Sequence, residues 1–472
     1  MDSYKKLINN TFIFSIGNLG TKLITFFLVP LYTYNLSTIE YGLTDLINTT
    51  ISLLIPVFTL STSDAILRFV MDKTYDKRVV LNNTLLIFFI GFVTVTFILL
   101  LFQQLLPFER YIMLFIAMLF TQTLQIGLGQ YVRAQGKVYL FALNGIFSAL
   151  VIFIGGFITL VKYNFGIIGY FISYIFGYSI SIFLLIIKGQ IWKDINIKLI
   201  KLSEIKKILR YSFPLMPNSL MWWIVNSSNR YVITLFLGLS ANGIFGVSSK
   251  IPSLLNVVNS IFFQAWQMSA IEEYDSKENS KFYSTVFNIF SFIMLFTTSL
   301  ILFLLKFIIG LLAENSYVES WKYVPFLLIG VVFSSFSGFL GTNYIAAKKT
   351  FGVFKSSVYG AIINIIILFS LVPNIGLNGA SIATMFSYFV IWIIRIKDTK
   401  KYVDIKVDWH KLAKNFIVVF LQIGILYVDI KLNYLIQVVL VFILCFINRD
   451  EILKMLKMIR KIINRKKRIR HR

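Results

Sequence analysis

The stretch Ser219–Gln267, SLMWWIVNSSNRYVITLFLGLSANGIFGVSSKIPSLLNVVNSIFFQAWQ, decides the fold that we expect for this chain. It contains two apolar segments, each long enough to cross the roughly 30 Å hydrocarbon core of a bilayer. Each segment carries a cation, Arg230 or Lys250, at a depth where membrane helices normally have none. Such a charge costs about 2.5 to 3.5 kcal/mol on insertion scales, so it usually faces a partner or a water-filled cavity. We therefore expect a cationic cavity.

The second of these segments also carries a polar stripe. Small and polar residues recur at steps of three and four, which places them on one face of a helix. Lys250 lies at the edge of this face, which cannot be turned toward lipid. The stripe consists of Gly246, Ser249, Ser253, Asn256, Ser260, Gln264 and Gln267.

The whole chain has the composition of a membrane protein. Of its 472 residues, 57% are hydrophobic and 14% are charged, and the mean hydropathy is +0.77. Apolar segments of about 20 residues follow one another along the chain, which predicts an all-α polytopic membrane protein with about 14 transmembrane helices. The expected spans are 12–35, 42–66, 82–106, 110–132, 139–161, 166–187, 213–237, 242–269, 283–306, 323–346, 353–372, 376–396, 413–429 and 432–448.

The net charge of +25 is compatible with nucleic-acid binding only if the basic residues share one face of a folded domain. Here they lie in loops and in the C-terminal tail, so we expect no nucleic-acid partner. Cys445 is the single cysteine, and the two histidines lie in a loop and in the tail, so no metal or disulfide framework is expected. The chain has no G-x-x-x-x-G-K-[ST] loop, and we expect no cofactor.

Lysine and arginine predict the orientation. They concentrate after the even-numbered spans, most densely in 188–210, in 395–414 and in the tail from Arg449. By the positive-inside rule both termini are then cytoplasmic, which agrees with an even number of spans. The final RKKRIRHR is interpreted as a topology signal, with anchoring to anionic lipid as the alternative.

An internal repeat is visible at an offset of roughly 210 residues. It predicts two parallel six-helix repeats related by an axis along the membrane normal, with a substrate site between them. The expected domains are an N-terminal lobe with a basic linker (1–210), a C-terminal lobe (211–396), and two extra helices with the tail (397–472). The matching residues are Gly166, Gly169, Phe176 and Tyr178 with Gly376, Gly379, Phe386 and Tyr388; Tyr131 and Ala134 with Tyr344 and Ala347; and Tyr41-Gly42 with Phe245-Gly246.

The repeat also predicts that the first two spans carry polar faces like those of the seventh and eighth. The sequence agrees with this expectation, and four polar faces from two lobes indicate one central cavity. Lys22 lies near the middle of its span, whereas Arg230 and Lys250 lie nearer the outer end. The polar residues are Thr11, Ser15, Asn18, Lys22 and Thr25; Asp45, Asn48, Ser52, Pro56, Thr59 and Ser63; and Ser219, Trp223, Asn226, Arg230 and Thr234.

Three motifs, STSDAILRF (61–69), YVRAQGK (131–137) and LVPNIGLNGASIAT (371–384), carry a family resemblance. With them the chain resembles, over nearly its whole length, the Wzx-type flippases of the multidrug/oligosaccharidyl-lipid/polysaccharide exporter superfamily. The resemblance implies two lobes in a V around a central cavity, in the bacterial cytoplasmic membrane. It implies transport of undecaprenyl-pyrophosphate-linked sugar repeat units without enzymatic chemistry. Membrane lipids, a polysaccharide polymerase and chain-length proteins are the partners it implies.

Charge and position select the candidate binding residues. Lys22, Arg230 and Lys250 are predicted to bind the pyrophosphate, with arginine acting as a bidentate fork and lysine as a point charge. The polar faces, including Asn18, Asn226 and Asn256, would bind sugar hydroxyls. Arg68 is a candidate for the cytoplasmic mouth, and Asp45 for binding a coupling proton or sodium ion.

These residues also have structural interpretations. Lys22 could pair with Asp45, Arg68 could pair with Asp64 four residues before it, and Arg230 or Lys250 could extend to the outer interface. The acidic residues Glu272, Glu273, Asp275 and Glu278 are interpreted as a solvated loop and not as a metal site.

Three other functions remain open at this point. A multidrug or cation antiporter of the same superfamily would need an acidic cavity, whereas the expected cavity is mainly basic. A membrane polysaccharide polymerase would need a large extramembrane loop, and the longest outer loop, 307–322, is short. A lipid II flippase shares the mechanism and is not distinguished by the sequence.

Overall fold

The computed structural model describes residues 2–72, 74–272, 274, 279–347, 349, 351–428, 432–455 and 457. These residues are almost entirely helical and contain no strand. The chain forms two compact units. The first consists of Met1–Val247 with Leu312–Tyr317, and the second of Ser248–Leu311 with Val318–Arg472.

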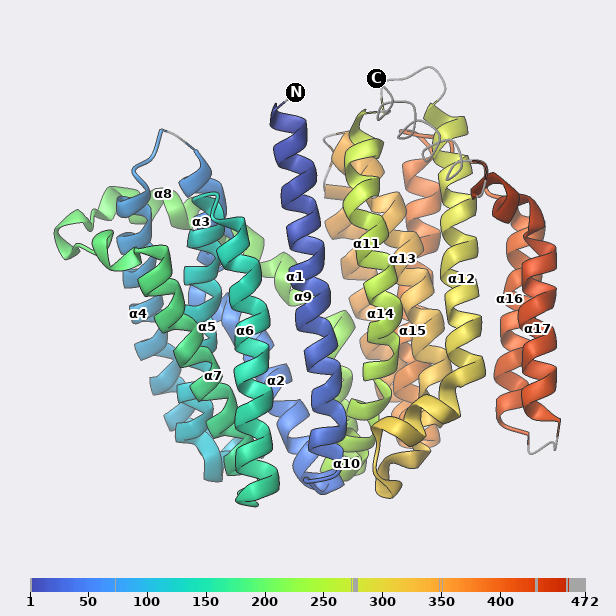
Figure 1. Cartoon of the computed structure of the whole chain (residues 1–472), viewed down its shortest axis with the longest axis horizontal. Helices are drawn as coiled ribbons and strands as arrows, with labels where there is room; N and C mark the ends of the chain where they lie inside the picture. Colours follow the sequence, from blue (N-terminus) through green and yellow to red (C-terminus); the bar gives the residue numbers. More distant parts are fainter. Residues whose placement is uncertain are drawn as a thin grey trace, which may run out of the picture. The chain divides into compact units, whose positions relative to one another are not determined.

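In the first unit, long helices stand side by side (Figure 1, blue to green). Helix α6 packs against α1 and α7, and α5 packs against α7. The short α3 packs against α4, α5 and α8. The helices are α1 (Asp2–Thr33), α2 (Thr38–Thr59), α3 (Thr62–Met71), α4 (Lys77–Leu101), α5 (Ile112–Ala134), α6 (Val138–Gly156), α7 (Gly166–Gly189), α8 (Leu202–Ser212), α9 (Met216–Ser227) and α10 (Asn229–Ser248).

The expected span 42–66 is divided between two helices. Helix α2 begins with a capping box, in which Ser37 and Glu40 bind each other's backbone N–H groups and so satisfy two free donors of the first turn. It ends where Leu60 and Ser61 adopt φ angles of 49° and 55°. Such angles are uncommon for residues other than glycine. The chain therefore turns at this point, and α3 starts in a new direction.

A second interruption lies between the expected spans 213–237 and 242–269. Gly238 has φ 84° and ψ 176°, a conformation that glycine adopts without steric cost, and it breaks the helical path inside α10. Helix α10 thus contains the end of one expected span and the beginning of the next.

The second unit is built around α13. Helix α15 packs against both α13 and α14, α11 packs against α13, and α16 pairs with α17 (Figure 1, yellow to red). Of the most apolar part of Asn315–Ala346, which contains α13, 78% is buried. This helix therefore forms the centre of the unit. The helices are α11 (Lys250–Glu272), α12 (Asn279–Leu312), α13 (Val324–Ala346), α14 (Phe351–Ile375), α15 (Leu377–Thr399), α16 (Trp409–Leu426) and α17 (Asn433–Ile447).

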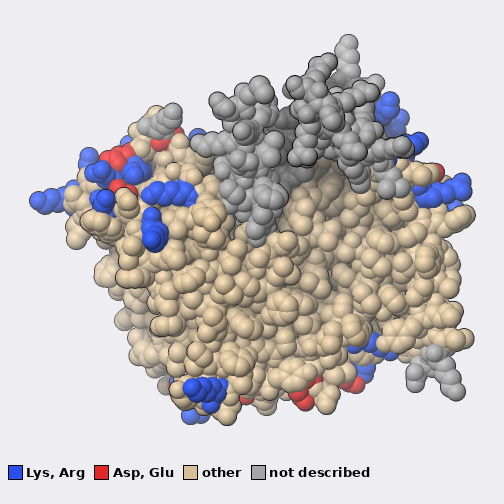
Figure 2. All heavy atoms as spheres, in the orientation of Figure 1, with Lys and Arg blue, Asp and Glu red and all other residues tan. Residues whose placement is uncertain are grey.

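The described residues confirm a polytopic helical membrane protein. Ten helical stretches are long and apolar enough to span a bilayer; one of them, Leu202–Phe263, is 62 residues long and covers two expected spans. Two shorter apolar helices, Leu19–Thr33 and Asn433–Ile447, add to these. Within the described residues, each expected span overlaps at least one helix. On the face shown in Figure 2, the charged residues of the first unit gather at the ends of its helices, above all around α8, and an uncharged band lies between.

Candidate functional site

The centre of the site is an ion pair between α2 and α10 of the first unit. Nε of Arg230 lies 3.3 Å from Oδ2 of Asp45, and the two side chains are only 14% and 12% exposed. Nη1 of Arg230 donates to the carbonyl of Asn226 over 3.2 Å, and Cζ lies 5.3 Å from the centre of the Phe245 ring. The guanidinium is therefore held by a carboxylate, a carbonyl and an aromatic face.

Glycines bring the two helices into backbone contact. A Cβ on Gly42 would lie 1.9 Å from the carbonyl oxygen of Leu239, and one on Gly243 would lie 2.1 Å from that of Thr38. A Cβ on Gly246 would lie 3.2 Å from the Asp45 carboxyl carbon. Small residues allow membrane helices to approach this closely. The glycines thus create the space that the Asp45 carboxylate occupies.

Hydrogen bonds connect α2 to α9 and α10 on both sides of this contact. Trp223 Nε1 donates to the Thr49 carbonyl (2.9 Å) and to Ser52 Oγ (3.1 Å). The hydroxyls of Thr50 and Tyr231 are 2.6 Å apart, those of Thr38 and Ser240 are 2.8 Å apart, and Asn242 Nδ2 donates to the Gly42 carbonyl over 2.8 Å. The polar faces expected on the second and seventh spans therefore meet, Asp45 with Arg230 and Ser52 with Trp223.

The structure gives Asp45 a different partner from the one that the sequence suggested. Its described ion pair is with Arg230, so the alternative of a Lys22–Asp45 pair is wrong here. Lys22 is exposed on α1. The sequence alone does not identify the partner, because which cation reaches Asp45 depends on the crossing of α2 and α10. The Tyr41-Gly42 and Phe245-Gly246 pairs, which the sequence shows as matching positions of the repeat, mark this crossing.

Of the remaining predicted residues, Asn226 adjoins this pair through its backbone carbonyl, which accepts from Arg230. Asn226 is exposed on α9, where its amide donates to the Trp222 carbonyl. Lys250, half-buried, and Asn256, exposed, belong to the second unit. The side chain of Asn18 lies outside the described residues, as do those of the acidic group Glu272, Glu273, Asp275 and Glu278.

Arg68 is exposed near the end of α3. Asp64 is also exposed, and the described ion pairs do not include one between Arg68 and Asp64. The pair that the sequence leaves open as an alternative for these two residues is therefore not formed. Arg68 acts instead on Asp72. The backbone N–H and hydroxyl of Thr74 hold the pKa of Asp72 below its ordinary value, and Arg68 makes a smaller contribution in the same direction. No group of three or more metal-binding side chains occurs in the described part of the chain.

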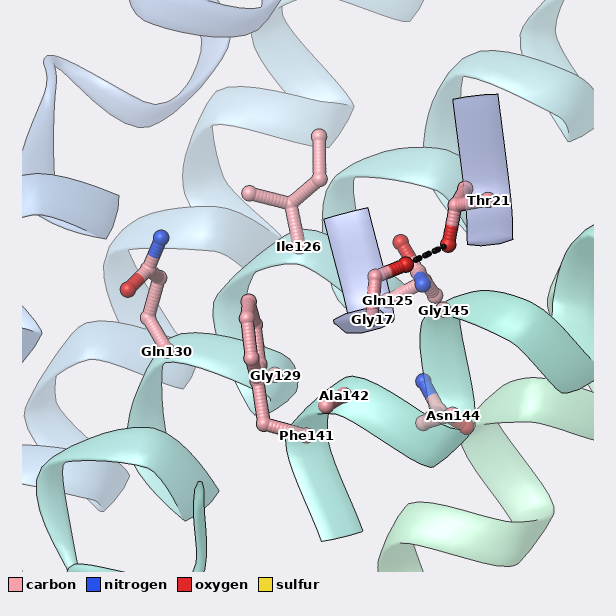
Figure 3. A pocket seen from close by; sticks show the side chains of 10 residues that line it. All are labelled: Gly17, Thr21, Gln125, Ile126, Gly129, Gln130, Phe141, Ala142, Asn144 and Gly145. Atoms are coloured by element: carbon pink, nitrogen blue, oxygen red, sulfur yellow. Dashed lines mark hydrogen bonds between the residues drawn. The ribbon is translucent and has the colours of Figure 1, made fainter. Parts of the chain in front are cut away.

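A separate cavity of about 210 Å³ lies between α1, α5 and α6 of the first unit. Figure 3 shows the hydrogen bond from Thr21 to the Gly17 carbonyl, 2.8 Å long, with Gln125 beside it. The lining is uncharged and carries three side-chain amides and one hydroxyl, which suit neutral polar groups. It consists of Gly17, Thr21, Gln125, Ile126, Gly129, Gln130, Phe141, Ala142, Asn144 and Gly145.

Comparison with known proteins gives a family match and a distant relative. Residues 7–267, more than half of the chain, match the family described as polysaccharide biosynthesis protein. An uncharacterised membrane protein of Methanocaldococcus jannaschii is 31% identical over 90 residues, which are 19% of this chain and 18% of the relative. The match therefore spans less than a fifth of that relative.

Solved structures share the fold. The lipid II flippase MurJ in an inward-closed conformation matches 93% of this chain and 100% of its own, with a TM-score of 0.70 and 16% identity. An inward-facing multidrug resistance MATE transporter of the MOP superfamily matches 82% and 98%, with a TM-score of 0.64 and 15% identity. A MOP transporter from Pyrococcus furiosus matches 84% and 96%, with a TM-score of 0.55 and 14% identity. At these identities the likeness shows the fold alone.

Proposed function

Since the chain belongs to the polysaccharide biosynthesis protein family, we propose that it is a flippase for undecaprenyl-pyrophosphate-linked oligosaccharide repeat units. It would move them by alternating access from the inner to the outer leaflet of a bacterial cytoplasmic membrane, with both termini cytoplasmic, for surface polysaccharide synthesis. The observation that carries this proposal is the Asp45–Arg230 pair. It keeps a guanidinium inside an apolar helical region, where a charge without a function is costly.

The geometry suits an exchange of anions. A guanidinium has five N–H donors in a planar fork that matches phosphate as well as carboxylate. Within the described residues, the Asp45 carboxylate accepts a hydrogen bond only from Nε of Arg230, at 3.3 Å. A pyrophosphate can therefore bind the guanidinium in place of Asp45, so that Arg230 always has an anionic partner. Lys22 and Lys250 would add positive charge elsewhere along the path. Exposed Asn226, one turn before Arg230, would bind sugar hydroxyls.

The same exchange gives Asp45 its proposed coupling role. When the pyrophosphate binds Arg230, the Asp45 carboxylate loses its counter-ion. It then binds a proton or a sodium ion. Outward movement of an anionic head is itself favoured by about 2.3 kcal/mol per charge for each 100 mV of membrane potential, negative inside. The polyprenyl tail remains in lipid while the head moves.

The test measures surface polysaccharide in cells in which variants replace the native copy. Arg230→Gln is expected to lower export about tenfold or more, because the fork to phosphate is lost. Arg110→Gln, which removes an exposed arginine of the same unit, is the matched control and is expected to export normally. Normal export by Lys22→Gln, Arg230→Gln and Lys250→Gln, singly and together, would refute the pyrophosphate role.

Two further readouts separate the competing functions. Vesicles that contain the purified protein are loaded either with lipid-linked oligosaccharide or with lipid II, which share the pyrophosphate and the polyprenyl tail. Preference for lipid II would assign the chain to that flippase class. Drug efflux that depends on Asp45, without an effect on polysaccharide, would indicate a multidrug antiporter instead.

A further inference from the structure

The linker that follows α7, defined here as residues 190–202 and including the first residue of α8, exposes large apolar side chains next to lysines. Trp192, Ile195, Ile197 and Leu202 are 59%, 47%, 80% and 81% exposed. Lys193, Lys198 and Lys201 are exposed between them along the chain. In water such apolar exposure is unfavourable, whereas apolar residues alternating with lysines are typical of a segment that lies in a membrane interface.

This linker has a fixed conformation. The Asp194 carboxylate is buried, where it accepts from Tyr131 (2.9 Å) and Gln135 (3.3 Å) and pairs with Lys77 and Arg78 at 3.5 and 3.4 Å. These contacts hold the middle of the linker against α4 and α5. The exposed apolar side chains are therefore presented outward by a defined backbone.

Two asparagines of α4 complete this attachment. Asn82 donates to the Asp194 carbonyl and accepts from the Asn196 N–H, both over 2.8 Å, and Asn83 accepts from the Lys201 N–H over 2.9 Å. Each asparagine side chain thus replaces a missing backbone partner in the linker.

The attachment also gives the position of the linker relative to the exposed apolar surface of α4. On α4 the exposed apolar residues begin at Phe89 and continue through Val93 and Phe97. Phe89 lies six residues beyond Asn83, which is about 9 Å along a helix. The linker therefore lies close to the level at which the lipid-facing surface of α4 starts, near the boundary between headgroups and acyl chains.

The neighbouring helix α8 does not cover these side chains. Its own apolar residues Ile205, Ile208 and Leu209 pack against a core formed by α3 and α4. Within the described residues, no ion pair engages Lys198 or Lys201, and Lys193 contacts only Gln190 and the Trp192 ring. The linker thus offers three cations and four apolar side chains to its surroundings.

We propose that residues 190–202 form a binding site for anionic phospholipids. Trp192, Ile195, Ile197 and Leu202 enter the outer part of the acyl region, and the three lysines bind the headgroup phosphates. This site is separate from Asp45 and Arg230 and does not depend on the transported substrate.

The test uses the full-length protein in vesicles of phosphatidylcholine that contain a small fraction of brominated lipid, either phosphatidylglycerol or phosphatidylcholine. Bromine quenches tryptophan at close range, and the difference between the native protein and Trp192→Phe isolates Trp192 among the seven tryptophans. We expect quenching of Trp192 to be at least about twofold stronger with brominated phosphatidylglycerol.

A triple variant, Lys193→Gln, Lys198→Gln and Lys201→Gln, is expected to abolish this preference, and arginine at the same positions to retain it. The control removes three lysines of the second unit, Lys397, Lys400 and Lys406, and is expected to leave the quenching of Trp192 unchanged. Equal quenching by both brominated lipids would overturn the anionic-lipid site. Absence of quenching by either would show that solvent or a protein partner covers the linker.

Discussion

Two arginines inside apolar helices, Arg230 in the first unit and Arg395 in the second, are stabilised in opposite ways. Arg395 is 2% exposed and is held by neutral groups, donating to Ser356 Oγ (2.9 Å) and to the carbonyls of Ser337 (2.8 Å) and Val353 (3.4 Å). Arg230 is partly exposed and holds a carboxylate. No described carboxylate lies within ion-pair distance of Arg395.

The difference indicates two roles. Arg395 lies in α15 and its partners come from α13 and α14, so this side chain joins three helices and is part of their packing. The main partner of Arg230 is another charged side chain, which the anionic substrate would replace under the proposed function. Neutral, permanent partners fit a structural role for Arg395, whereas a carboxylate partner fits the transport role that we propose for Arg230.

The largest expected effect is on stability, from Arg395→Ala. The substitution removes the hydrogen bonds to the Ser337 carbonyl and to Ser356 Oγ and truncates a side chain that is 2% exposed, while the Val353 carbonyl keeps the Ser356 and Ser357 hydroxyls as donors. The two lost buried hydrogen bonds, at about 1–3 kcal/mol each, together with the lost packing, predict a loss of about 3–5 kcal/mol. Thermal unfolding in detergent measures it, with Arg230→Ala as the comparison. If both variants unfold at the same temperature, the assignment of separate roles is wrong.

The second effect concerns the helix contact that positions Arg230. Gly42→Ala places a methyl group 1.9 Å from a backbone oxygen, so α2 and α10 must separate. We expect a loss of about 1–3 kcal/mol and reduced export, because Asp45 moves away from Arg230. Gly310→Ala is the control, since a Cβ there meets no atom within 4 Å. Equal behaviour of the two variants in unfolding and export assays would contradict the importance of this contact.

The sequence predicts the membrane spans well because their length and hydrophobicity are set by the bilayer. It also predicts polar faces on the second and seventh spans, but it assigns them to the wall of a cavity, and their direct contact is seen only in the structure. The sequence does not predict the turn at Leu60–Ser61, because neither residue is a glycine, the residue type that usually indicates a positive φ. It counts Arg395, at the end of the expected span 376–396, among the cations of the basic loop that follows, whereas the residue is buried in α15. Counting charges along the sequence does not distinguish an exposed loop from a buried position in a helix. The burial of Arg395 depends on helices that are distant from it in the sequence.

The family resemblance seen in the sequence is confirmed by the family match and by the shared fold. The expected lobes 1–210 and 211–396 remain a prediction, as do the binding roles of the individual residues. The three sequence motifs are sufficient to identify the shared fold. The roles of individual residues depend on which charged side chains pair, and for Asp45 the crossing of α2 and α10 is needed to identify the partner.

A third prediction separates charge balance from phosphate binding. Asp45→Asn leaves the Arg230 guanidinium without its anion, and Arg230→Gln leaves the carboxylate without its cation. Each is expected to cost about 1–2 kcal/mol, below the range for a fully buried pair because both side chains are partly exposed. The double variant is expected to recover stability but not export, since the cation for phosphate is still missing. Recovery of export by the double variant would show that the pair is structural, like Arg395.

The smallest expected effect is from Trp223→Phe, which keeps the ring but removes the indole N–H. Its donations to the Thr49 carbonyl and Ser52 Oγ fasten α9 to α2 beside the ion pair. We expect a stability loss of about 0.5–1.5 kcal/mol, because the indole donations are lost, while the Thr49 carbonyl keeps the Ser52 hydroxyl as a donor and the ring remains packed against Tyr231. Trp321→Phe is the control; its ring packs on Tyr427 in the second unit. If Trp223→Phe lowers export far more than stability, Trp223 contacts the substrate, and the proposed binding site around Arg230 extends to α9.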